Sequence, residues 1–379
     1  MEKSYYNSYL EIDMKIIKDN IAIIRKHLLP EQNYIPVIKS NAYGTGLIKM
    51  GQFFQNNMNM PLIAVAQIYE GIQLRENNVN QCEILVMSGV PSASVDAGIQ
   101  YNLQINVSNE KIALEVSKAA QKRNITAKIH IMIETGLNRI GVKYGEELEK
   151  LVKYIKVLGN LEINGVFTHF ATAGVEGNDY TLEQFELFKS AVKQLKSYGI
   201  RPQYIHARNS AASTWLHDDF CTHIRCGALH LGYNGLPNTS NPLGTKEALT
   251  WRSYITNIRT IKPGESVGYS RFFKPDKIAK VAIISTGSGD GLFRPLGTSF
   301  APVLVNGVKT KFIGSDMDQF YINVTDIDCD LDDEVTLFGK DKTSDMVLSP
   351  VEGALIVGQA RSTMHAYITD RVQRIYLNE

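Results

Sequence analysis

Residues 34–46 read YIPVIKSNAYGTG, and the rest of the chain is organised around this stretch. Residues 34–38 form a short apolar run that is rich in β-branched side chains and is followed at once by Asn and Gly, which predicts a buried strand entering a loop. Lys39 comes at the end of that strand. An ammonium group there loses water on several sides, which lowers its pKa and frees an amine for covalent chemistry with a carbonyl group. The alternative is a lysine that extends along apolar surface to reach solvent.

Seven further short apolar runs follow this strand, and segments of helical period separate several of them. The runs lie at residues 62–65, 84–87, 103–107, 127–131, 163–167, 204–207 and 222–225, and the helical segments at 111–123, 146–158 and 182–198. Strands that alternate with helices pair in parallel, and eight of them in about two hundred residues fit a (β/α)8 barrel. We therefore predict an α/β fold with a TIM-like barrel over residues 1–240. A doubly wound open sheet is the alternative, but no Gly-x-Gly-x-x-Gly turn follows the first strand.

Both ends of the predicted barrel have recognisable boundaries. Residues 10–29 carry apolar side chains at helical spacing, and Pro30 ends that segment. A Pro-, Gly- and Asn-rich linker covers residues 237–244. Beyond the linker come short alternating runs broken by glycines, at residues 254–260, 278–285, 303–305, 320–324 and 334–338. This pattern predicts a β-rich C-terminal domain over residues 241–379.

The composition narrows the class of protein. The chain has 379 residues, 44% of them hydrophobic, and a net charge of +1, which gives no reason to expect nucleic acid or an anionic membrane as a partner. No apolar run approaches the ~20 residues of a membrane span, and the first residues lack the apolar core of a signal peptide. The four cysteines form no Cys-x-x-Cys pair, so we expect free buried thiols. We expect a soluble cytoplasmic protein and no metal site.

Residues 39–46, KSNAYGTG, resemble the cofactor-lysine motif of the alanine racemase family, Lys-x-Asn-Ala-Tyr-Gly-x-Gly. The similarity to this family continues over nearly the whole chain, from residue 11 to residue 374. The resemblance implies that Lys39 holds pyridoxal 5′-phosphate covalently and that Tyr43 also contacts this cofactor. It further implies a racemase that acts on a small amino acid.

A second matching stretch is residues 132–142, MIETGLNRIGV, which resembles the family's Asp-Thr-Gly-Met-x-Arg-Ile-Gly. Arg139 then corresponds to the arginine that holds the substrate carboxylate. A guanidinium group suits this role because it stays charged and can bind a carboxylate through two parallel hydrogen bonds. Taken alone, an arginine after a Thr-Gly turn is more often a surface ion-pair residue.

Two histidine segments also match the family. Residues 165–173, GVFTHFATA, look like its Thr-His-Phe-Ala segment, and residues 206–212, HARNSAA, are similar to its His-x-x-Asn-Ser-Ala-Ala. The resemblance implies that His206 packs against the cofactor ring and that Ser210 binds the cofactor phosphate, beside the outward-pointing amides of a helix N-terminus. His169 is either a cofactor-site residue or a buried histidine that orients its neighbours.

Residues 225–228, RCGA, match the family's Arg-x-Gly at the last strand. The resemblance implies that Arg225 faces the pyridine nitrogen of the cofactor and that the amides of Gly227 and Ala228 reach the phosphate. An arginine does not readily give up a proton, so the ring nitrogen stays unprotonated. The cofactor is then a weaker electron sink than one paired with aspartate, which favours quick reprotonation at Cα over transamination.

Residues 265–270, ESVGYS, resemble the family's catalytic tyrosine segment, Val-Ser-Tyr-Gly. Inversion of a stereocentre by proton transfer needs one acid/base group on each face of the planar carbon, and the resemblance assigns Lys39 to one face and Tyr269 to the other. A phenol titrates near ~10, so a nearby cation such as Arg139 must help it act as a base. In the family this tyrosine comes from the other subunit, which implies a homodimer with shared active sites.

Several positions depart from the family pattern. Met132 stands where many members carbamylate a lysine to support the substrate arginine, which leaves Arg139 dependent on another anion. Glu134 replaces the usual aspartate, and Thr45 replaces a common histidine. In the second domain, Ser288 stands at a position where family members carry a tyrosine.

Two further departures lie in the second domain. Asp370 replaces another tyrosine, and residues 314–319 are one residue shorter than the family's Gly-Arg-x-x-Met-Asp-Gln and lack its arginine. Met317, whose backbone amide meets the substrate carboxylate in relatives, remains. Loss of two tyrosines and an arginine opens the predicted site, so we expect a substrate range broader than alanine, or one shifted toward serine or a basic amino acid. Asp370 is then a candidate substrate-binding residue, which would accept a hydrogen bond from a serine hydroxyl or pair with a cationic substrate side chain. A lone buried carboxylate is costly, so the alternative is that Asp370 is exposed or paired with Arg294 or Arg371.

Two other readings remain. One is a pyridoxal phosphate-dependent amino-acid decarboxylase of the same architecture, although such enzymes usually pair the ring nitrogen with an acidic residue rather than with one like Arg225. The other is a non-catalytic cofactor-binding protein, which has no use for two opposed bases such as Lys39 and Tyr269.

Overall fold

The computed structural model describes residues 5–236, 241–293, 301–356 and 364–379. These form two compact units, each described here by itself. The barrel unit comprises Ile21–His230 and Asn234–Thr245, and the β-rich unit comprises Met1–Asn20, Leu231–Tyr233 and Lys246–Glu379. Part of the predicted linker, residues 237–240, lies outside the described residues. The predicted domain limits at residues 240 and 241 stay a prediction.

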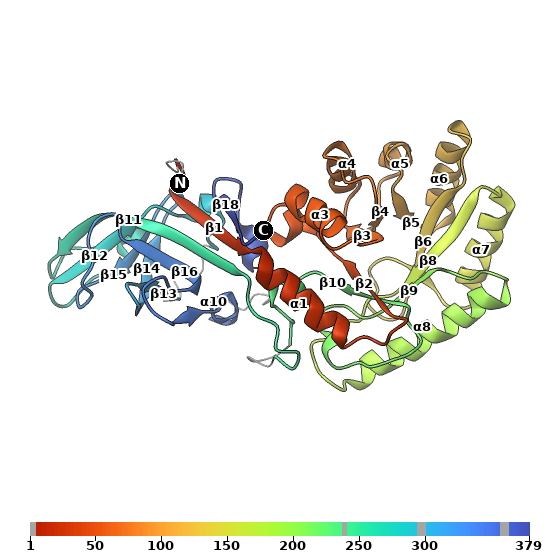
Figure 1. Ribbon diagram of the computed structural model, residues 1–379. Coiled ribbons are helices and arrows are strands. Elements are labelled where there is room, and N and C mark those ends of the chain that lie inside the picture. Colours follow the sequence, from red (N-terminus) through yellow and green to blue (C-terminus); the bar gives the residue numbers. More distant parts are fainter. Residues whose placement is uncertain (1–4, 237–240, 294–300, 357–363) are drawn as a thin grey trace. The chain divides into compact units, whose positions relative to one another are not determined.

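The barrel unit is built on eight parallel strands, which confirms the predicted (β/α)8 fold (Figure 1). The strands are β2 (Asn33–Pro36), β3 (Leu62–Val65), β4 (Glu83–Val86), β5 (Gln104–Asn106), β6 (Ala127–Glu134), β8 (Leu161–Phe167), β9 (Tyr204–His206) and β10 (His223–Cys226). They are hydrogen-bonded in the order β2-β10-β9-β8-β6-β5-β4-β3. A single parallel bridge between Val37 and Ala64 joins the two ends. All eight strands lie where the apolar runs predicted them.

Helices follow most of these strands and cover the outside of the barrel (Figure 1). They are α3 (Leu47–Asn56), α4 (Ile68–Glu76), α5 (Ser92–Gln100), α6 (Glu110–Lys122), α7 (Glu146–Leu158) and α8 (Asp179–Ser197). Helix α1 (Met14–Lys26) precedes β2, and the short element α2 (Lys39–Tyr43) follows β2. The three predicted helical segments correspond to α6, α7 and α8. The side chains of Asn109 and Asn178 cap α6 and α8 by accepting the amide hydrogens of Ile112 and Thr181.

The predicted N-terminal helix is wrong at its start. Residues 8–13 form strand β1 (Ser8–Asp13), which pairs antiparallel with β11 and parallel with β18. Leu10 and Ile12 are fully buried in this sheet. Helix α1 begins at Met14 because Asp13 accepts the amide hydrogen of Ile16 and so caps the helix. The N-terminal strand therefore belongs to the β-rich unit.

The β-rich unit contains a ring of six strands, which confirms the predicted β-rich domain. The ring strands are β11 (Leu249–Ile261), β12 (Ala279–Ile284), β13 (Pro302–Val305), β14 (Val308–Ser315), β15 (Phe320–Asn323) and β16 (Glu334–Lys340), and pairing of β16 with β11 closes it. Strands β17 (Val347–Leu348) and β18 (Gln373–Leu377) extend the sheet, and a helix, α10 (Pro350–Ile356), follows β17.

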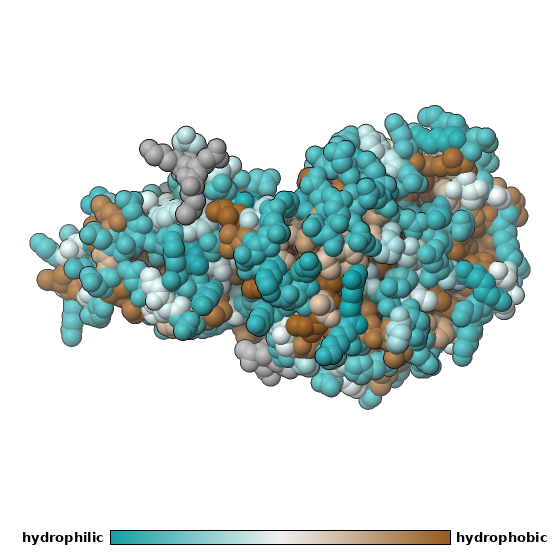
Figure 2. Space-filling model, in the orientation of Figure 1, coloured by the Kyte–Doolittle hydropathy of each residue, from teal (hydrophilic) through white to brown (hydrophobic). Residues whose placement is uncertain are grey.

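The surface is largely polar. On the face seen in Figure 2, hydrophilic residues predominate and hydrophobic residues form small scattered patches. Within the part of the chain that the structure describes, no helix has both the length and the apolar character needed to cross a membrane.

Candidate active site

The lysine of the opening motif lies in an unusual turn. Helix α2 is left-handed rather than the expected loop: φ is 55° at Ser40, 53° at Asn41 and Ala42, and 57° at Tyr43. Left-handed backbone costs about 1–2 kcal/mol for each residue with a Cβ, so the turn needs support from its surroundings. Glu70 provides part of it, since its Oε1 accepts the amide hydrogen of Ser40 at 2.6 Å.

Further hydrogen bonds hold the same turn. Asn41 Oδ1 accepts the amide hydrogen of Leu47 at 2.8 Å, and Thr45 Oγ1 donates to the carbonyl of Ala42 at 2.6 Å. The second oxygen of Glu70 accepts the amide hydrogens of Ala66 and Gln67, which ties the turn to the start of α4. The turn therefore fixes the direction of both Lys39 and Tyr43.

Both of those side chains line a pocket formed where the barrel strands end. Its empty volume is about 850 Å³, a size usual for small-molecule sites. Seven of the predicted site residues line it together: Lys39, Tyr43, Arg139, His169, Ser210, Arg225 and Gly227. Polar groups gathered at the carboxyl ends of barrel strands are the arrangement in which this fold carries out chemistry.

The pocket is strongly cationic. Lys39, Arg139 and Arg225 line it, and no carboxylate is among its lining residues. The pKa of Lys39 lies below its ordinary value, chiefly because the amine is buried and then because Arg139 adds positive charge nearby. The pocket therefore suits an anionic ligand and holds an amine that deprotonates more readily than an exposed lysine.

One corner of the pocket has the character of a phosphate site. Ser210 Oγ lies 3.3 Å from the amide nitrogen of Gly227 and 3.4 Å from that of Leu229. A Cβ at position 227 would lie 2.2 Å from the Tyr43 hydroxyl oxygen, so only glycine allows that hydroxyl so close to the backbone. Two hydroxyls and two amide groups thus converge. Ala228 is buried next to Gly227 and is not among the pocket-lining residues.

The predicted helix N-terminus beside Ser210 is absent. Only a three-residue 3₁₀ turn, Ala212–Thr214, follows the serine. The amide groups that surround Ser210 come instead from the segment after β10, which was predicted to reach the phosphate through Gly227 and Ala228.

Arg225 is buried with almost all of its hydrogen-bond donors engaged. Its Nη1 donates to His206 Nδ1 at 3.0 Å and to the His206 carbonyl at 2.8 Å. Its Nη2 donates to the carbonyls of Thr168 and Ala207 and to His169 Nδ1. Among the described residues no acceptor is found for the Nε–H, which leaves one donor for a ligand in the pocket that Arg225 lines.

The charge of Arg225 is maintained without an acidic partner. Burial lowers its pKa to about 10, so the guanidinium remains charged at neutral pH. All the acceptors around it are neutral: three carbonyls and two imidazoles. A ligand atom that accepts from Arg225 therefore gains no proton from it.

The two histidines of the matching segments lie differently relative to the pocket. His206 does not line the pocket, because it is fully buried with its ring stacked on Phe167 at a centroid distance of 5.1 Å. His169 lines the pocket in its place. Burial lowers the pKa of His169 to about 3, with a further contribution from Arg225, so this imidazole is neutral.

The segment of Arg139 is held by Glu134. The Glu134 carboxylate accepts the amide hydrogen of Gly136 at 2.7 Å and that of Arg139 at 3.1 Å. Burial alone would raise the pKa of Glu134, but the backbone hydrogen bonds lower it below its ordinary value. Met132, at the position of the missing lysine, is buried. Within the described residues the Arg139 side chain has no carboxylate partner.

Three predicted site residues belong to the β-rich unit. Tyr269 is 77% exposed at the start of a 3₁₀ turn (Tyr269–Arg271), and Met317 is 67% exposed. Asp370 is also exposed, with Oδ1 3.6 Å from Arg374 Nη1. Their relation to Lys39 stays a prediction, because each unit is described by itself.

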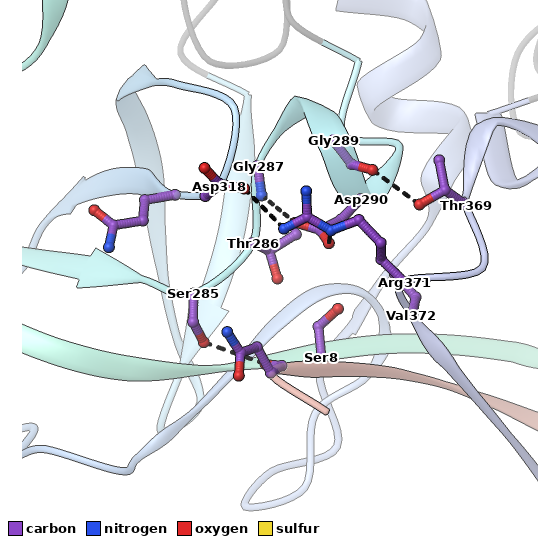
Figure 3. A network of polar contacts seen from close by, with 12 residues as sticks. Ser8, Ser285, Thr286, Gly287, Gly289, Asp290, Asp318, Thr369, Arg371 and Val372 are labelled. Atoms are coloured by element: carbon purple, nitrogen blue, oxygen red, sulfur yellow. Dashed lines mark hydrogen bonds and ion pairs between the residues drawn. The ribbon is translucent and has the colours of Figure 1, made fainter. Parts of the chain in front are cut away.

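The segments that depart from the family pattern are joined by Arg371 (Figure 3). Its Nε lies 3.0 Å from Asp290 Oδ1 and its Nη2 lies 2.8 Å from Asp318 Oδ1. Thr369 Oγ1 also donates to the carbonyl of Gly289 at 2.9 Å. Arg371 therefore pairs with Asp290 and Asp318 rather than with Asp370. Arg294, the other predicted partner of Asp370, lies outside the described residues. The loops that carry Ser288, Met317 and Asp370 are thus held together.

Sequence reasoning did not identify several residues of the site. The pocket is also lined by Met87, Ser88, Gly89, Phe167 and Asn209. In the sequence, the only indication that these residues belong to the site is their position, since all of them lie at or just beyond the ends of predicted strands. Glu70 had a clearer signal: it follows Gln67 by three residues at the start of α4, the spacing of a capping box.

No metal site accompanies the pocket in the part of the chain described. Neither the barrel unit nor the β-rich unit holds a group of three or more His, Cys, Asp or Glu side chains that could bind a metal ion, as far as their residues are described.

Comparisons with known proteins agree along the chain. The family model described as alanine racemase, N-terminal domain, matches residues 12–235, and that described as alanine racemase, C-terminal domain, matches residues 248–376. The chain is 32% identical to alanine racemase 1 of Clostridium acetobutylicum, covering 97% of this chain and 95% of that protein. It is 33% identical to alanine racemase of Clostridium perfringens, with 97% and 95% covered.

A solved structure shows the same fold. The crystal structure of alanine racemase from a D-cycloserine-producing Streptomyces lavendulae superposes with a TM-score of 0.92 at 25% identity, covering 100% of this chain and 98% of that one. The family models, the relatives and the solved structure all indicate the same family, and the cationic pocket lined by Lys39 is consistent with it. The chain therefore belongs to the alanine racemase family of pyridoxal 5′-phosphate-dependent amino-acid racemases.

Proposed function

We propose that this protein interconverts the L and D forms of alanine and of other small amino acids, using pyridoxal 5′-phosphate held on Lys39. The observation that carries the proposal is the donor pattern of Arg225, whose Nη groups are all engaged by neutral acceptors while its Nε–H has none among the described residues. A guanidinium fixed in this way offers a hydrogen bond to a pyridine nitrogen but no proton.

The remaining features of the pocket fit the same cofactor. The hydroxyls of Tyr43 and Ser210 and the amide of Gly227 converge in one corner, as a phosphate requires. Lys39 has a lowered pKa in the same pocket, which favours the neutral amine needed for attachment. When bound, pyridoxal 5′-phosphate supplies an electron sink that acidifies the proton on Cα of the amino acid.

The residues of the chain then divide the work. Arg139 binds the substrate carboxylate through its guanidinium, for which no competing carboxylate is found among the described residues. Lys39 takes or returns the Cα proton on one face. Tyr269 of the partner subunit does so on the other face, which makes the enzyme a homodimer with two shared sites. Support for this assignment comes from the 77% exposure of Tyr269 in a single chain.

Arg225 also bears on the reaction type. A ring nitrogen that accepts a hydrogen bond without gaining a proton leaves the cofactor a weak electron sink. A weak sink would favour rapid return of a proton to Cα over transamination. The neutral partners of Arg225 also differ from the acidic residue that decarboxylases of this architecture usually place at the ring nitrogen. A carrier without catalysis would have no use for two opposed bases such as Lys39 and Tyr269.

We further propose that the substrate range extends beyond alanine. Ser288 and Asp370 replace two tyrosines of the family pattern, and the segment of Met317 lacks an arginine. Their loops are joined through Arg371. A smaller side chain at 288 and an exposed carboxylate at 370 favour serine or a basic amino acid as additional substrates.

A direct experiment tests the reaction. Each enantiomer of alanine, serine, lysine and arginine is incubated with the holoenzyme in deuterium oxide, followed by chiral chromatography and mass spectrometry. We expect racemic product with one deuterium at Cα and an intact carbon skeleton for alanine, with slower turnover of at least one other amino acid. Loss of carbon dioxide would refute racemisation, and turnover of alanine alone would refute the broader range.

A second measurement tests the cofactor site. The visible absorbance of the bound cofactor should disappear in Lys39→Ala and persist in Lys49→Ala, a lysine of helix α3 outside the pocket. Equal absorbance in both variants would refute attachment at Lys39.

A further inference from the structure

A line of buried polar side chains leads from Arg225 into the interior of the barrel. Arg225 Nη1 contacts His206 Nδ1 at 3.0 Å, and His206 Nε2 lies 3.3 Å from His130 Nδ1. His130 Nε2 lies 2.8 Å from Gln104 Oε1. The residues come from β10, β9, β6 and β5, and none is more than 4% exposed. Three of them therefore lie beyond Arg225, away from any direct contact with the pocket.

The direction of these hydrogen bonds has only one solution. A guanidinium can only donate, so His206 Nδ1 must accept and its proton must be on Nε2. His206 then donates to His130 Nδ1, which places the His130 proton on Nε2, and that proton goes to Gln104 Oε1. Asn164 Nδ2 donates to the same Gln104 oxygen at 3.1 Å, so this oxygen has two donors, whereas Gln104 Nε2 is buried without a hydrogen-bond partner among the described residues. Reversal would bring a His206 N–H against the guanidinium.

The two imidazoles are also neutral and held in place. Burial lowers the pKa of His130 to about 3 and takes that of His206 well below its ordinary value, and Arg225 contributes to both shifts. The His130 ring stacks on Tyr204 at a centroid distance of 5.7 Å. A Cβ at position 165 would lie 2.2 Å from His130 Nδ1, so Gly165 makes room for the ring. Neutral, fixed rings keep one proton each and therefore one order of donors.

We propose that His130 and Gln104 are positioning residues for Arg225: they hold His206 as the Nε2–H tautomer, which keeps an acceptor against Arg225 Nη1 and leaves the Arg225 Nε–H for the ring nitrogen of the cofactor. The inference rests on the proposed function, because it concerns the same Arg225. It adds that the electronic character of the cofactor is set by residues on β5 and β6 that never touch it.

Loss of the acceptor at position 130 leaves the His206 Nε2–H as an unpaired donor. Without an acceptor at position 130, the His206 Nε2–H has no partner in a dry interior, which favours transfer of the proton to Nδ1. That proton then opposes the Arg225 Nη1–H and turns the guanidinium out of position. His130→Leu removes the acceptor, whereas His130→Asn keeps an oxygen near the place of Nδ1 and is the matched control.

The first readout needs no cofactor. In apoenzyme with ¹⁵N-labelled histidine, long-range ¹H–¹⁵N spectra report the tautomer of each ring. We expect neutral Nε2–H signals for His130 and His206 in the wild type and for His206 in His130→Asn. In His130→Leu we expect a substantial Nδ1–H population at His206. A wild-type His206 in the Nδ1–H form would overturn the proposal, as would a His130→Leu protein with the wild-type tautomer.

The second readout uses the holoenzyme. In His130→Leu we expect kcat for alanine racemisation to fall about tenfold while KM changes less than twofold, an effect at the low end of what residues behind metal ligands carry. The ratio of transamination to racemisation should rise, and His130→Asn should restore both values. Unchanged kcat and ratio in His130→Leu would overturn the positioning role.

Two further controls complete the experiment. If His130→Leu does not fold, as judged by circular dichroism, Gln104→Met decides instead, because it leaves the His130 Nε2–H without its acceptor and should shift the same signals. Wild-type protein with the expected tautomers but no racemisation of any amino acid would refute the proposed function while supporting the hydrogen-bond order itself.

Discussion

At the scale of single residues, the site depends on side chains whose ordinary properties are changed by burial. Lys39 loses affinity for its proton because it is buried next to Arg139, whereas Arg225 keeps its charge although every acceptor around it is neutral. Gly227 acts by what it lacks, since its missing Cβ leaves room for the Tyr43 hydroxyl. These three features give the pocket an amine, a fixed cation and a phosphate corner.

The lowered pKa of Lys39 predicts the pH dependence of cofactor attachment. Only the neutral amine attacks a carbonyl, and a group with a lowered pKa is neutral over a wider pH range. The rate at which apoenzyme takes up pyridoxal 5′-phosphate should therefore rise with pH and level off at a pH below 10.5, the ordinary lysine value. Stopped-flow absorbance measures this rate. A rate that still rises steadily through pH 10.5 would contradict a lowered pKa.

Gly227→Ala tests the phosphate corner. The added Cβ would lie 2.2 Å from the Tyr43 hydroxyl oxygen, so Tyr43 must move away. We expect the dissociation constant for pyridoxal 5′-phosphate to rise at least about tenfold, which is the loss of one hydrogen bond to a charged group. Fluorescence titration of apoenzyme gives this constant. Gly199→Ala, at an open helix end outside the pocket, is the control, and equal effects in both variants would argue against the assignment.

At the scale of elements, the left-handed turn α2 is the part of the site that the sequence indicated least well. The apolar run at 34–38 and the turn-forming residues after it predicted the strand, because a short run rich in β-branched residues is typical of a buried strand. The positive φ values at Ser40 and Ala42 carry no local signal, since neither residue favours them. The support comes from Glu70, thirty residues farther along. Contacts of this kind depend on the assembled barrel.

The same limit explains the error at the N-terminus. Leu10 and Ile12 have a spacing that suits either a strand or the start of the helix that follows them. Partners β11 and β18 lie more than two hundred residues away in the sequence and decide the matter. The residues of the motifs, in contrast, could be predicted to meet, because carboxyl ends of consecutive parallel strands share one rim. A motif does not tell which neighbour covers a ring, and the stacking of His206 on Phe167 could not be predicted from it.

Glu70→Gln tests the support of the turn. The carboxylate accepts three amide hydrogens, from Ser40, Ala66 and Gln67, and an amide cannot accept all three as well. We expect the free energy of unfolding to fall by about 1–3 kcal/mol, the cost of unmade hydrogen bonds in a buried place. Affinity for the cofactor should fall as well. Denaturant unfolding measures the first effect. Glu76→Gln, at an exposed position near the end of α4, should change neither the free energy of unfolding nor the affinity for the cofactor. Equal effects in both variants would mean that Glu70 does not support the turn.

Arg371→Ala tests whether the joined loops set the substrate range. The side chain links the loop of Ser288 to the turn of Met317 through Asp290 and Asp318. Without it we expect KM for alanine to rise several-fold, and the ratio of kcat/KM for serine over alanine to change, while cofactor affinity stays within twofold. Steady-state kinetics with both substrates measure this. Arg371→Lys should retain part of the wild-type ratio because it keeps one charge. An unchanged ratio in Arg371→Ala would mean that these loops do not choose the substrate.

At the scale of the whole molecule, the chain supplies two kinds of unit for one reaction. The barrel unit carries the cationic pocket that Lys39 lines. The β-rich unit carries Tyr269, Met317 and Asp370 on exposed positions. In the proposed mechanism Tyr269 of one chain meets Lys39 of another, and on this proposal we expect the enzyme to be active only as a dimer.

Complementation between two inactive variants tests whether Lys39 of one chain and Tyr269 of another share an active site. Lys39→Ala and Tyr269→Ala are each expected to lose nearly all racemase activity. When the two are unfolded and refolded together, half of the dimers are mixed, and each mixed dimer has one intact site, so about one quarter of wild-type activity should return. Activity no higher than that of the separate variants would contradict a site shared between chains.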